Sequence, residues 1–280
     1  TRGFRDQLRI AYQARPRLFD MEITLPEMLY SRIEEVSERI DAHDNILVPL
    51  DLDDLEPRLQ AAYDDGIRAV AIVLMHGYRV PVHEFAVAAL ARQIGFTQIS
   101  TSHRTSPMIK FVARGDTTVA DAYLSPILRR YIDRLARDID QSKSTRLQLM
   151  QSNGGLTDSS LFQGKDAILS GPAGGIVGAV KTAEQAGFDK VITFDMGGTS
   201  TDVAHYATGY ERVFDTVVAG VRINAPMLLI HTVAAGGGSI CRFDQGRFRV
   251  GPESAGANPG PACYRRGGPL AVTDCNVMLG

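Results

Sequence analysis

The sequence predicts an α/β fold, and two features of the chain support this prediction. Apolar, β-branched runs typical of strands alternate with segments of helical periodicity over most of the first 185 residues. The run at residues 190–194 is followed closely by an acid, two glycines and three hydroxyl residues. Alternating strand and helix order favours a substantially parallel sheet, and such sheets bind ligands at the carboxyl ends of their strands.

The expected elements follow from local composition. Residues 46–51 form a candidate strand, and residues 51–66 have helical spacing with an acidic first turn and a glycine at the end. Residues 68–75 are apolar throughout, as in a buried parallel strand. Further strands are expected at residues 96–102, 145–152, 164–170, 190–194 and 201–206, and further helices at residues 83–94, 117–141 and 173–185. Beyond Gly209 we expect short strands, with an ordered, irregular loop at residues 251–269.

Composition excludes several classes of protein. Hydrophobic residues make up 44% of the 280 residues and charged residues 22%, which is typical of a chain that buries an ordinary core. A formal net charge of −2 gives no general attraction to nucleic acid or to an anionic membrane. Three cysteines without CxxC spacing indicate neither a disulfide framework nor a zinc site. We therefore expect a cytoplasmic protein with no nucleic-acid or membrane partner.

The ends of the chain suggest a piece of a longer polypeptide. It begins at Thr1 without a methionine and stops at Gly280, within an apolar run. The first ten residues lack the apolar region of a secretory signal. We expect the missing parts to limit what the chain does alone.

The stretch FDMGGTSTDVA, residues 194–204, has the composition of a phosphate-binding turn. Gly197 and Gly198 let backbone N–H groups approach an anion without an intervening Cβ. Hydroxyl donors follow at Thr199, Ser200 and Thr201. Asp195 would repel a phosphate unless Mg²⁺ lay between them, reached through a retained water. The alternation that resumes at residue 201 predicts a hairpin; a plain hairpin whose glycines serve only backbone geometry is the alternative.

This stretch resembles the second phosphate-binding hairpin of the actin, sugar kinase and Hsp70 superfamily, which has a ribonuclease H-like ATPase fold. Residues 170–180, SGPAGGIVGAV, look like the small-residue helix that precedes this hairpin in that superfamily. A dinucleotide-binding loop is the rival interpretation of these residues, although their spacing is not GxGxxG.

Longer motifs make the resemblance narrower. In chain order they are TRGFRDQLRIAYQARPRLFD, PEMLY, LMHGYRVPVHE, LMQSNGGL, LSGPAGGIVGA, FDMGGTSTDVA, TVAAGGGS and VGPESAGANPGPACYRRGGPLAVTD. Together they resemble the hydantoinase A/5-oxoprolinase family over essentially the whole chain. The resemblance implies that residues 1–112 are the C-terminal part of an N-terminal domain and residues 113–280 the first part of an ATPase domain. It also implies a first phosphate-binding hairpin upstream of Thr1, so that this incomplete fold is expected to be inactive alone.

The resemblance further implies a reaction. In it, 5-oxo-L-proline, ATP and water give L-glutamate, ADP and phosphate, and phosphoryl transfer to the lactam oxygen makes the ring carbon open to attack. The expected partners are the lactam substrate and a hydantoinase B-like domain or subunit, and homo-oligomerisation is left open. A related hydantoinase, an ATP-dependent ketone carboxylase subunit and a noncatalytic nucleotide-dependent switch are the alternatives.

The resemblance implies ATP and Mg²⁺ as cofactors and assigns roles around the turn. Asp195 is expected in the Mg²⁺ shell, with Gly197, Gly198 and Thr199 on the phosphates and Ser200 beside them. Weaker candidates are Thr201 and Asp202, which is expected to orient the turn. A second glycine run, Gly236, Gly237 and Gly238, is expected either to wrap an anion or to form a structural turn. No catalytic residue or general base is assigned.

Other polar residues admit two interpretations each. His76 and His231 stand where ligand contacts are common, yet a hydrogen-bonded structural histidine is the simpler interpretation of His76. His83 with Glu84 lacks the second histidine of a metal motif and is interpreted as a helix start. Cys263 has no adjacent base that would make it a nucleophile.

Overall fold

The computed structural model describes residues 1–11, 19, 21–22, 25, 27–139 and 146–280. Most of the motif QARPRLFD, residues 13–20, and the first residue of PEMLY lie outside the described residues. The chain forms two compact units. Unit 1 comprises Thr1–Gln151, Leu156–Ile168 and Val213–Pro226, and unit 2 comprises Ser152–Gly155, Leu169–Arg212 and Met227–Gly280.

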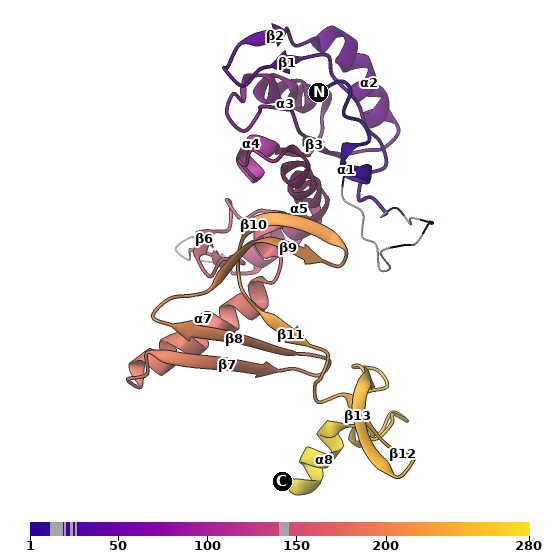
Figure 1. The fold of residues 1–280 in the computed structure, drawn as a ribbon, viewed down its shortest axis with the longest axis vertical. Coiled ribbons are helices and arrows are strands. Elements are labelled where there is room, and N and C mark those ends of the chain that lie inside the picture. Colours follow the sequence, from indigo (N-terminus) through magenta and orange to yellow (C-terminus); the bar gives the residue numbers. More distant parts are fainter. Residues whose placement is uncertain (12–18, 20, 23–24, 26, 140–145) are drawn as a thin grey trace. The chain divides into compact units, whose positions relative to one another are not determined.

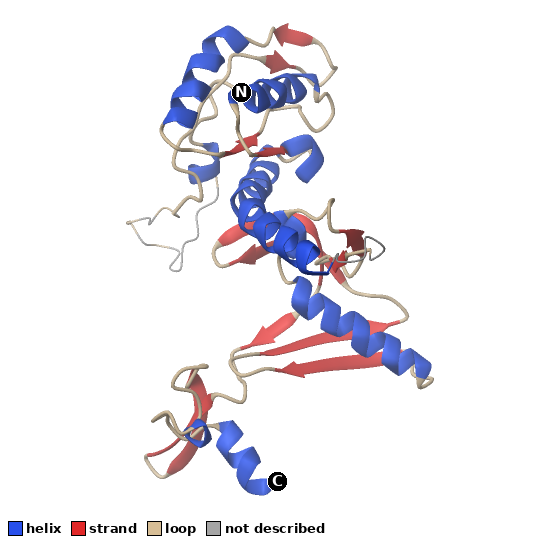
Figure 2. Ribbon diagram, turned by 180° about the vertical axis from the view of Figure 1, so that it is seen from behind, coloured by secondary structure: helices blue, strands red, loops and turns tan. Residues whose placement is uncertain are grey.

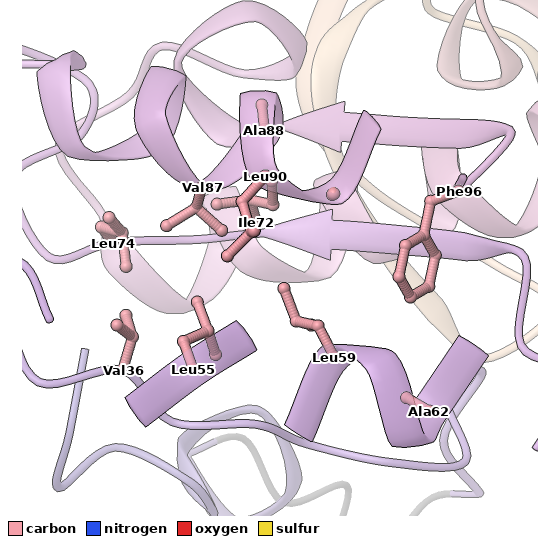
Figure 3. Close-up of a cluster of buried hydrophobic side chains, with 11 residues drawn as sticks. Val36, Leu55, Leu59, Ala62, Ile72, Leu74, Val87, Ala88, Leu90 and Phe96 are labelled. Carbon is pink, nitrogen blue, oxygen red and sulfur yellow. The ribbon is translucent and has the colours of Figure 1, made fainter. Parts of the chain in front are cut away.

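The core of unit 1 surrounds a short parallel pair, β3 (Ala69–Ile72) and β4 (Gln98–Thr101). Helix α2 (Leu52–Asp64) begins at Asp51, whose carboxylate accepts a hydrogen bond from the Asp54 N–H at 3.0 Å. Helix α3 (Val82–Ile94) ends at Gly95, which has the left-handed φ of 115° that favours glycine. Figure 3 shows Leu55 and Leu59 of α2 pointing toward Ile72 of β3. These elements agree with the sequence prediction.

Helix α5 (Phe111–Ile139) is the long helix of unit 1 and packs on β3, β4 and α6 (Gly164–Ala167). It begins six residues earlier than predicted. The strand predicted at residues 164–170 was wrong, because α6 occupies its first half. A capping box between Gln163 and Asp166 stabilises the start of α6. A Cβ on Gly164 would lie only 2.8 Å from the Leu124 Cβ, so α6 packs closely on α5.

A hairpin completes unit 1. Strands β9 (Arg212–Val218) and β10 (Val221–Leu228) are hydrogen-bonded neighbours that belong largely to this unit. The Ser106 hydroxyl donates to the Asn224 carbonyl at 2.9 Å, and the Asn224 N–H donates to the Thr117 hydroxyl at 2.7 Å. The hairpin is therefore held on α5. The remaining short elements of unit 1 are α1 (Gln7–Ile10), β1 (Arg39–Ile40), β2 (Ile46–Val48), α4 (Ser102–Thr105), β5 (Gln148–Met150) and β6 (Leu156–Asp158).

Unit 2 contains a three-stranded antiparallel sheet in the order β11–β8–β7, with α7 (Ser170–Gln185) lying along it (Figure 1). The strands are β7 (Lys190–Met196), β8 (Thr201–Ala207) and β11 (His231–Val233). Buried Ala173, Ile176 and Val180 of α7 join Ala204 and Tyr206 of β8 in one apolar cluster. A second hairpin, β12 (Ser239–Asp244) with β13 (Arg247–Ser254), lies beside α8 (Val272–Leu279), as Figure 2 shows from behind. The loop that joins β13 to α8 contains a 3₁₀ turn at Ala262–Tyr264.

The α/β prediction is confirmed, but the prediction of a substantially parallel sheet was wrong for most strands. In the described residues β3 and β4 pair in parallel, whereas β1–β2, β5–β6, β7–β8, β8–β11 and β12–β13 pair antiparallel. Short hairpin connections force this for β1–β2, β5–β6, β7–β8 and β12–β13, since parallel neighbours need a crossover of about a dozen residues. No helix formed by the described residues is long and apolar enough to cross a membrane. The domain division predicted after residue 112 stays a prediction.

A partly buried acid on α5 makes the stability of unit 1 depend on pH. Burial raises the pKa of the Asp116 carboxyl to about 6, although the charge of Arg222 acts to lower it. The carboxyl is therefore neutral in the folded protein at a pH where the unfolded chain would ionise it.

We expect Asp116→Asn to raise the free energy of unfolding near pH 8 and to change it little near pH 4. Because the pKa is higher in the folded state, the stabilising contribution is complete below about pH 4 and is lost as the pH rises through about 6. The variant lacks this loss, which is at most about 3 kcal/mol. Urea unfolding at both pH values measures the effect. Asp133→Asn, at an exposed position of the same helix, is the control, and an unchanged pH dependence in Asp116→Asn would contradict the assignment.

Candidate functional site

The predicted phosphate-binding turn joins two paired strands of unit 2. Strands β7 and β8 pair antiparallel, with Asp195 opposite Asp202 and Met196 opposite Thr201. The four residues between them form the turn, which the Gly197 N–H closes by donating to the Ser200 carbonyl at 2.9 Å. The hairpin prediction is therefore confirmed, and we call residues 197–200 the phosphate turn.

Three consecutive N–H groups of the phosphate turn are unused. Those of Gly198, Thr199 and Ser200 donate to no acceptor within the described part of the chain. Gly198 and Thr199 are exposed, and a Cβ built on Gly198 would meet no atom within 4 Å. Adjacent, open backbone donors of this kind make an anion-binding concavity. The turn therefore fits a phosphate group.

The second glycine run braces the phosphate turn. Gly237 N–H donates to the Gly197 carbonyl at 2.9 Å, and Gly238 N–H donates to the Gly198 carbonyl at 2.7 Å. In a trans peptide the C=O of one residue and the N–H of the next point in opposite directions. Fixing these two carbonyls toward the glycine run therefore fixes the N–H groups of Gly198 and Thr199 away from it.

The geometry does not favour direct contact between an anion and the N–H groups of the glycine run. The Gly236 N–H donates to the Ser239 hydroxyl at 3.0 Å, so the N–H groups of all three glycines are used within the protein. A Cβ on Gly236 would lie 2.7 Å from the Gly197 oxygen, and one on Gly238 would lie 2.8 Å from the Gly198 oxygen. Glycine is needed here because the two backbones touch.

The base of the phosphate turn is tied to the strand beside it. The buried Thr201 hydroxyl donates to the Ala235 carbonyl at 2.6 Å. The Asp202 carboxylate accepts a hydrogen bond of 2.6 Å from the Thr232 hydroxyl of β11. Both side chains therefore use their polar atoms to hold the hairpin, whereas the hydroxyls of Thr199 and Ser200 have no partner among the described residues.

Asp195 lies against the glycine-rich helix. A Cβ on Gly175 of α7 would lie 3.5 Å from the Asp195 Oδ2, which is an ordinary van der Waals separation, so the carboxylate lies directly beside this helix. The carboxylate is exposed and accepts no hydrogen bond from the described residues. The described residues contain no cluster of three or more His, Cys, Asp or Glu side chains suited to a metal. One carboxylate fits Mg²⁺ only when phosphate oxygens and water complete its shell.

The start of α8, which sequence analysis did not connect to the site, holds the glycine run. Thr273, at the start of α8, donates to the Gly237 carbonyl through its N–H at 2.7 Å and its hydroxyl at 2.8 Å. The neighbouring Asp274 accepts from the N–H groups of Ala262, Cys263 and Ala271. A hydrogen bond from the Cys263 thiol, with these N–H donors, lowers the pKa of the Asp274 carboxyl to about 2. The sequence signal for these two residues was that they end the family motif that begins at Val250.

The remaining candidates have structural contacts or lie on the surface. The His76 Nδ1 lies 2.5 Å from the Ile40 carbonyl oxygen, and the His83 Nδ1 lies 3.0 Å from the buried Glu38 carboxylate. His231 is exposed on β11 opposite Val203. His76 is therefore a hydrogen-bonded structural histidine, and His83 lies in the first turn of α3, as the helix-start interpretation expected.

Known proteins identify the family. Residues 114–280 match the family described as Hydantoinase/oxoprolinase, and residues 1–95 match the Hydantoinase/oxoprolinase N-terminal region. The chain belongs to this family. Its α/β architecture is the actin, sugar kinase and Hsp70-like ATPase fold that fits the family.

Relatives of this family match the chain along its whole length. It is 45% identical to 5-oxoprolinase 1 of Arabidopsis thaliana and 42% identical to 5-oxoprolinase of Saccharomyces cerevisiae. All of the chain aligns with each of them but only 24% of either relative is covered, so the chain spans about a quarter of their length. It is also 36% identical to the caprolactamase subunit alpha of Pseudomonas jessenii and covers 42% of that protein.

Two solved structures have the same fold. The ATP-dependent caprolactamase from Pseudomonas jessenii superposes with a TM-score of 0.81 at 34% identity, over all of this chain and 42% of that one. A nucleotide-free acetone carboxylase superposes with a TM-score of 0.69 at 25% identity, over 88% of this chain and 36% of that one. The family thus includes proteins named for different carbonyl substrates.

We expect Gly236→Ala to lower the free energy of unfolding by about 1–3 kcal/mol, because the new methyl group meets backbone atoms that cannot rotate away. Gly198→Ala is the matched control, since its methyl group points into open space. Its effect should stay within about 0.5 kcal/mol. Urea unfolding measures both. Equal stability of the two variants would show that the glycine run does not press on the phosphate turn.

Proposed function

We propose that this chain is part of an ATP-hydrolysing enzyme that opens a cyclic amide, and that the phosphate turn binds the phosphates of ATP. The observation that carries this proposal is the row of unused N–H groups at Gly198, Thr199 and Ser200 beside the Asp195 carboxylate. Membership of the hydantoinase/oxoprolinase family supports it, as do relatives named 5-oxoprolinase and ATP-dependent caprolactamase.

The residues divide into those that contact the nucleotide and those that hold the turn. Backbone N–H groups of residues 198–200 and the hydroxyls of Thr199 and Ser200 donate to phosphate oxygens. Asp195 would hold Mg²⁺, whose charge would offset the repulsion between this carboxylate and the phosphates. The supporting residues are Gly197, Thr201, Asp202, Gly236, Gly237 and Gly238.

In the proposed reaction this chain has to position the phosphates of ATP and stabilise their negative charge. ATP, when bound, would supply the phosphoryl group that activates the lactam oxygen, with ADP as the leaving group; attack of water on the ring carbon would then open the ring and release phosphate. A preorganised row of dipoles stabilises negative charge on the phosphates without rearranging during the reaction. The braced turn meets this requirement because hydrogen bonds within the protein fix its carbonyls.

The substrate proposed is 5-oxo-L-proline, with L-glutamate, ADP and phosphate as products. Relatives named 5-oxoprolinase from Arabidopsis thaliana, Saccharomyces cerevisiae and Dictyostelium discoideum, 40–45% identical to this chain, support this choice. The caprolactamase match favours a second candidate, a larger lactam opened by the same ATP-dependent step. A hydantoinase B-like domain or subunit as partner and a cytoplasmic location remain proposals.

We expect Asp195→Asn, in the complete native protein, to lower Mg²⁺-dependent ATP hydrolysis by at least about tenfold while the fold is retained. The amide removes the charge that holds the metal but keeps the size of the side chain. ADP release at varied Mg²⁺ concentration measures the effect, and circular dichroism checks the fold. Unchanged turnover at every Mg²⁺ concentration would remove the metal assignment of Asp195.

Gly198→Ala should weaken ATP binding without destabilising the protein. Its methyl group meets nothing in the folded chain but would stand between the turn and an approaching phosphate. Gly178→Ala, on α7 with no atom within 4 Å of its added Cβ, is the control and should bind ATP normally. Calorimetric titration with ATP and Mg²⁺ separates the two, and equal affinities would contradict phosphate binding at the turn.

The substrate is tested by measuring which compound stimulates ADP release from the native protein. Stimulation by 5-oxo-L-proline, with equimolar glutamate formed, is the expected result. Stimulation by caprolactam instead would assign the second candidate. ATP hydrolysis that no lactam stimulates would reject both and favour a nucleotide-dependent switch.

A further inference from the structure

A polar hollow of about 190 Å³ lies within unit 1, between the end of α3, strand β4, helices α4 and α5 and the loop at residues 160–163. Three arginines line it, Arg92, Arg104 and Arg129, against a single acid, Asp121. Three guanidinium groups and one carboxylate leave two net positive charges around the hollow. An anion is therefore favoured there over a cation.

The wall of the hollow is firmly held. Arg129 of α5 donates to the Ser159 carbonyl at 2.9 Å and to the Phe162 carbonyl at 3.0 Å. The Gly164 N–H donates to the Ser125 hydroxyl at 2.9 Å. These bonds fasten the loop onto α5, so the hollow is formed before any ligand arrives and binding requires little reorganisation.

The one acid in the wall already accepts hydrogen bonds from neighbouring residues. Asp121 is 2% exposed and accepts from the hydroxyls of Ser100 and Ser125 at 2.6 and 3.2 Å and from the Lys165 N–H at 3.1 Å. It makes no ion pair with any of the three arginines. Asp121 therefore stabilises the wall without neutralising the arginines.

Four donors around the hollow have no acceptor. Within the described residues, the side chains of Arg92 and Arg104 make neither an ion pair nor a hydrogen bond. The same holds for the hydroxyls of Thr101 and Thr105, two residues that are only 6% and 4% exposed overall. Arg92 and Arg104 are exposed. Two hydroxyls and two guanidinium groups are therefore free to donate to an oxygen-rich ligand in the hollow.

We propose that this hollow binds a small oxyanion, a phosphate or the carboxylate of a small acid. Guanidinium groups bind both in bidentate geometry, and threonine hydroxyls supply further donors. The hollow is smaller than the roughly 300 Å³ of an ordinary ligand pocket, which excludes a whole nucleotide. It lies in unit 1, whereas the phosphate turn lies in unit 2, so the two sites use no residue in common.

The test is calorimetric titration of the native protein with inorganic phosphate and, separately, with acetate, against sodium chloride at matched ionic strength. Saturable binding of one of the two anions is expected, and the anion that binds identifies the class. Arg92→Gln and Arg104→Gln should each weaken binding by about tenfold or more, since each removes a charged hydrogen bond. Thr105→Val, which keeps the shape of the buried side chain, should weaken it less.

Arg134→Gln, at an exposed position of α5 outside the hollow, is the matched control and should bind the anion normally. Circular dichroism confirms that each variant is folded. Saturable phosphate binding that survives in Arg92→Gln, Arg104→Gln and Thr105→Val would place the anion elsewhere, for example at the phosphate turn, and would overturn the proposal. Absence of saturable binding of both anions to the parent protein would overturn it as well.

Discussion

Two backbone hydrogen bonds determine what the phosphate turn presents to solvent. The carbonyls of Gly197 and Gly198 accept them from Gly237 and Gly238, at 2.9 and 2.7 Å. Because each peptide is rigid, a carbonyl held toward the protein turns the next N–H group outward. An exposed turn would otherwise sample many conformations, and an anion would have to order it on binding. The braced turn avoids that entropic loss.

Further hydrogen bonds hold the residues that flank these two bonds. Thr201 and Asp202 hold the base of the hairpin to Ala235 and Thr232, and Thr273 holds Gly237 in turn. None of these contacts requires a ligand, so the geometry belongs to the folded protein. The exposed N–H groups are consequently preorganised dipoles of the kind that stabilise phosphate charge best. Function in this unit thus depends on contacts made by residues that do not touch the nucleotide.

Sequence reasoning found the parts of the site that local chemistry determines. The spacing of Asp195, Gly197 and Gly198 after an apolar run predicted the hairpin and its exposed turn, because hairpin and donor geometry depend on neighbours along the chain. The part played by Gly236–Gly238 was open between anion binding and a structural turn, since the contact with residues 197–198 spans about forty positions. Composition alone does not show whether a glycine faces a ligand or another backbone.

The same difference between local and long-range contacts explains the errors in the predicted fold. Residues 164–170 were predicted as a strand because their apolar content is ambiguous, and the capping box at Gln163 and Asp166 decided for helix. Parallel pairing was expected from alternating elements, yet short turns such as residues 197–200 make antiparallel neighbours. The helices α2 and α3 were predicted well because caps and periodicity are local signals, whereas α5 begins six residues before its predicted start.

The most direct test is a crystal structure of the native protein with ADP and Mg²⁺ bound. Phosphate oxygens within roughly 3 Å of the backbone nitrogens of Gly198 and Thr199 are the predicted result, with the metal near Asp195 and the two glycine-run hydrogen bonds unchanged. A nucleotide whose phosphates lie elsewhere, or a phosphate turn that has left Gly237 and Gly238 on binding, would contradict the central claim.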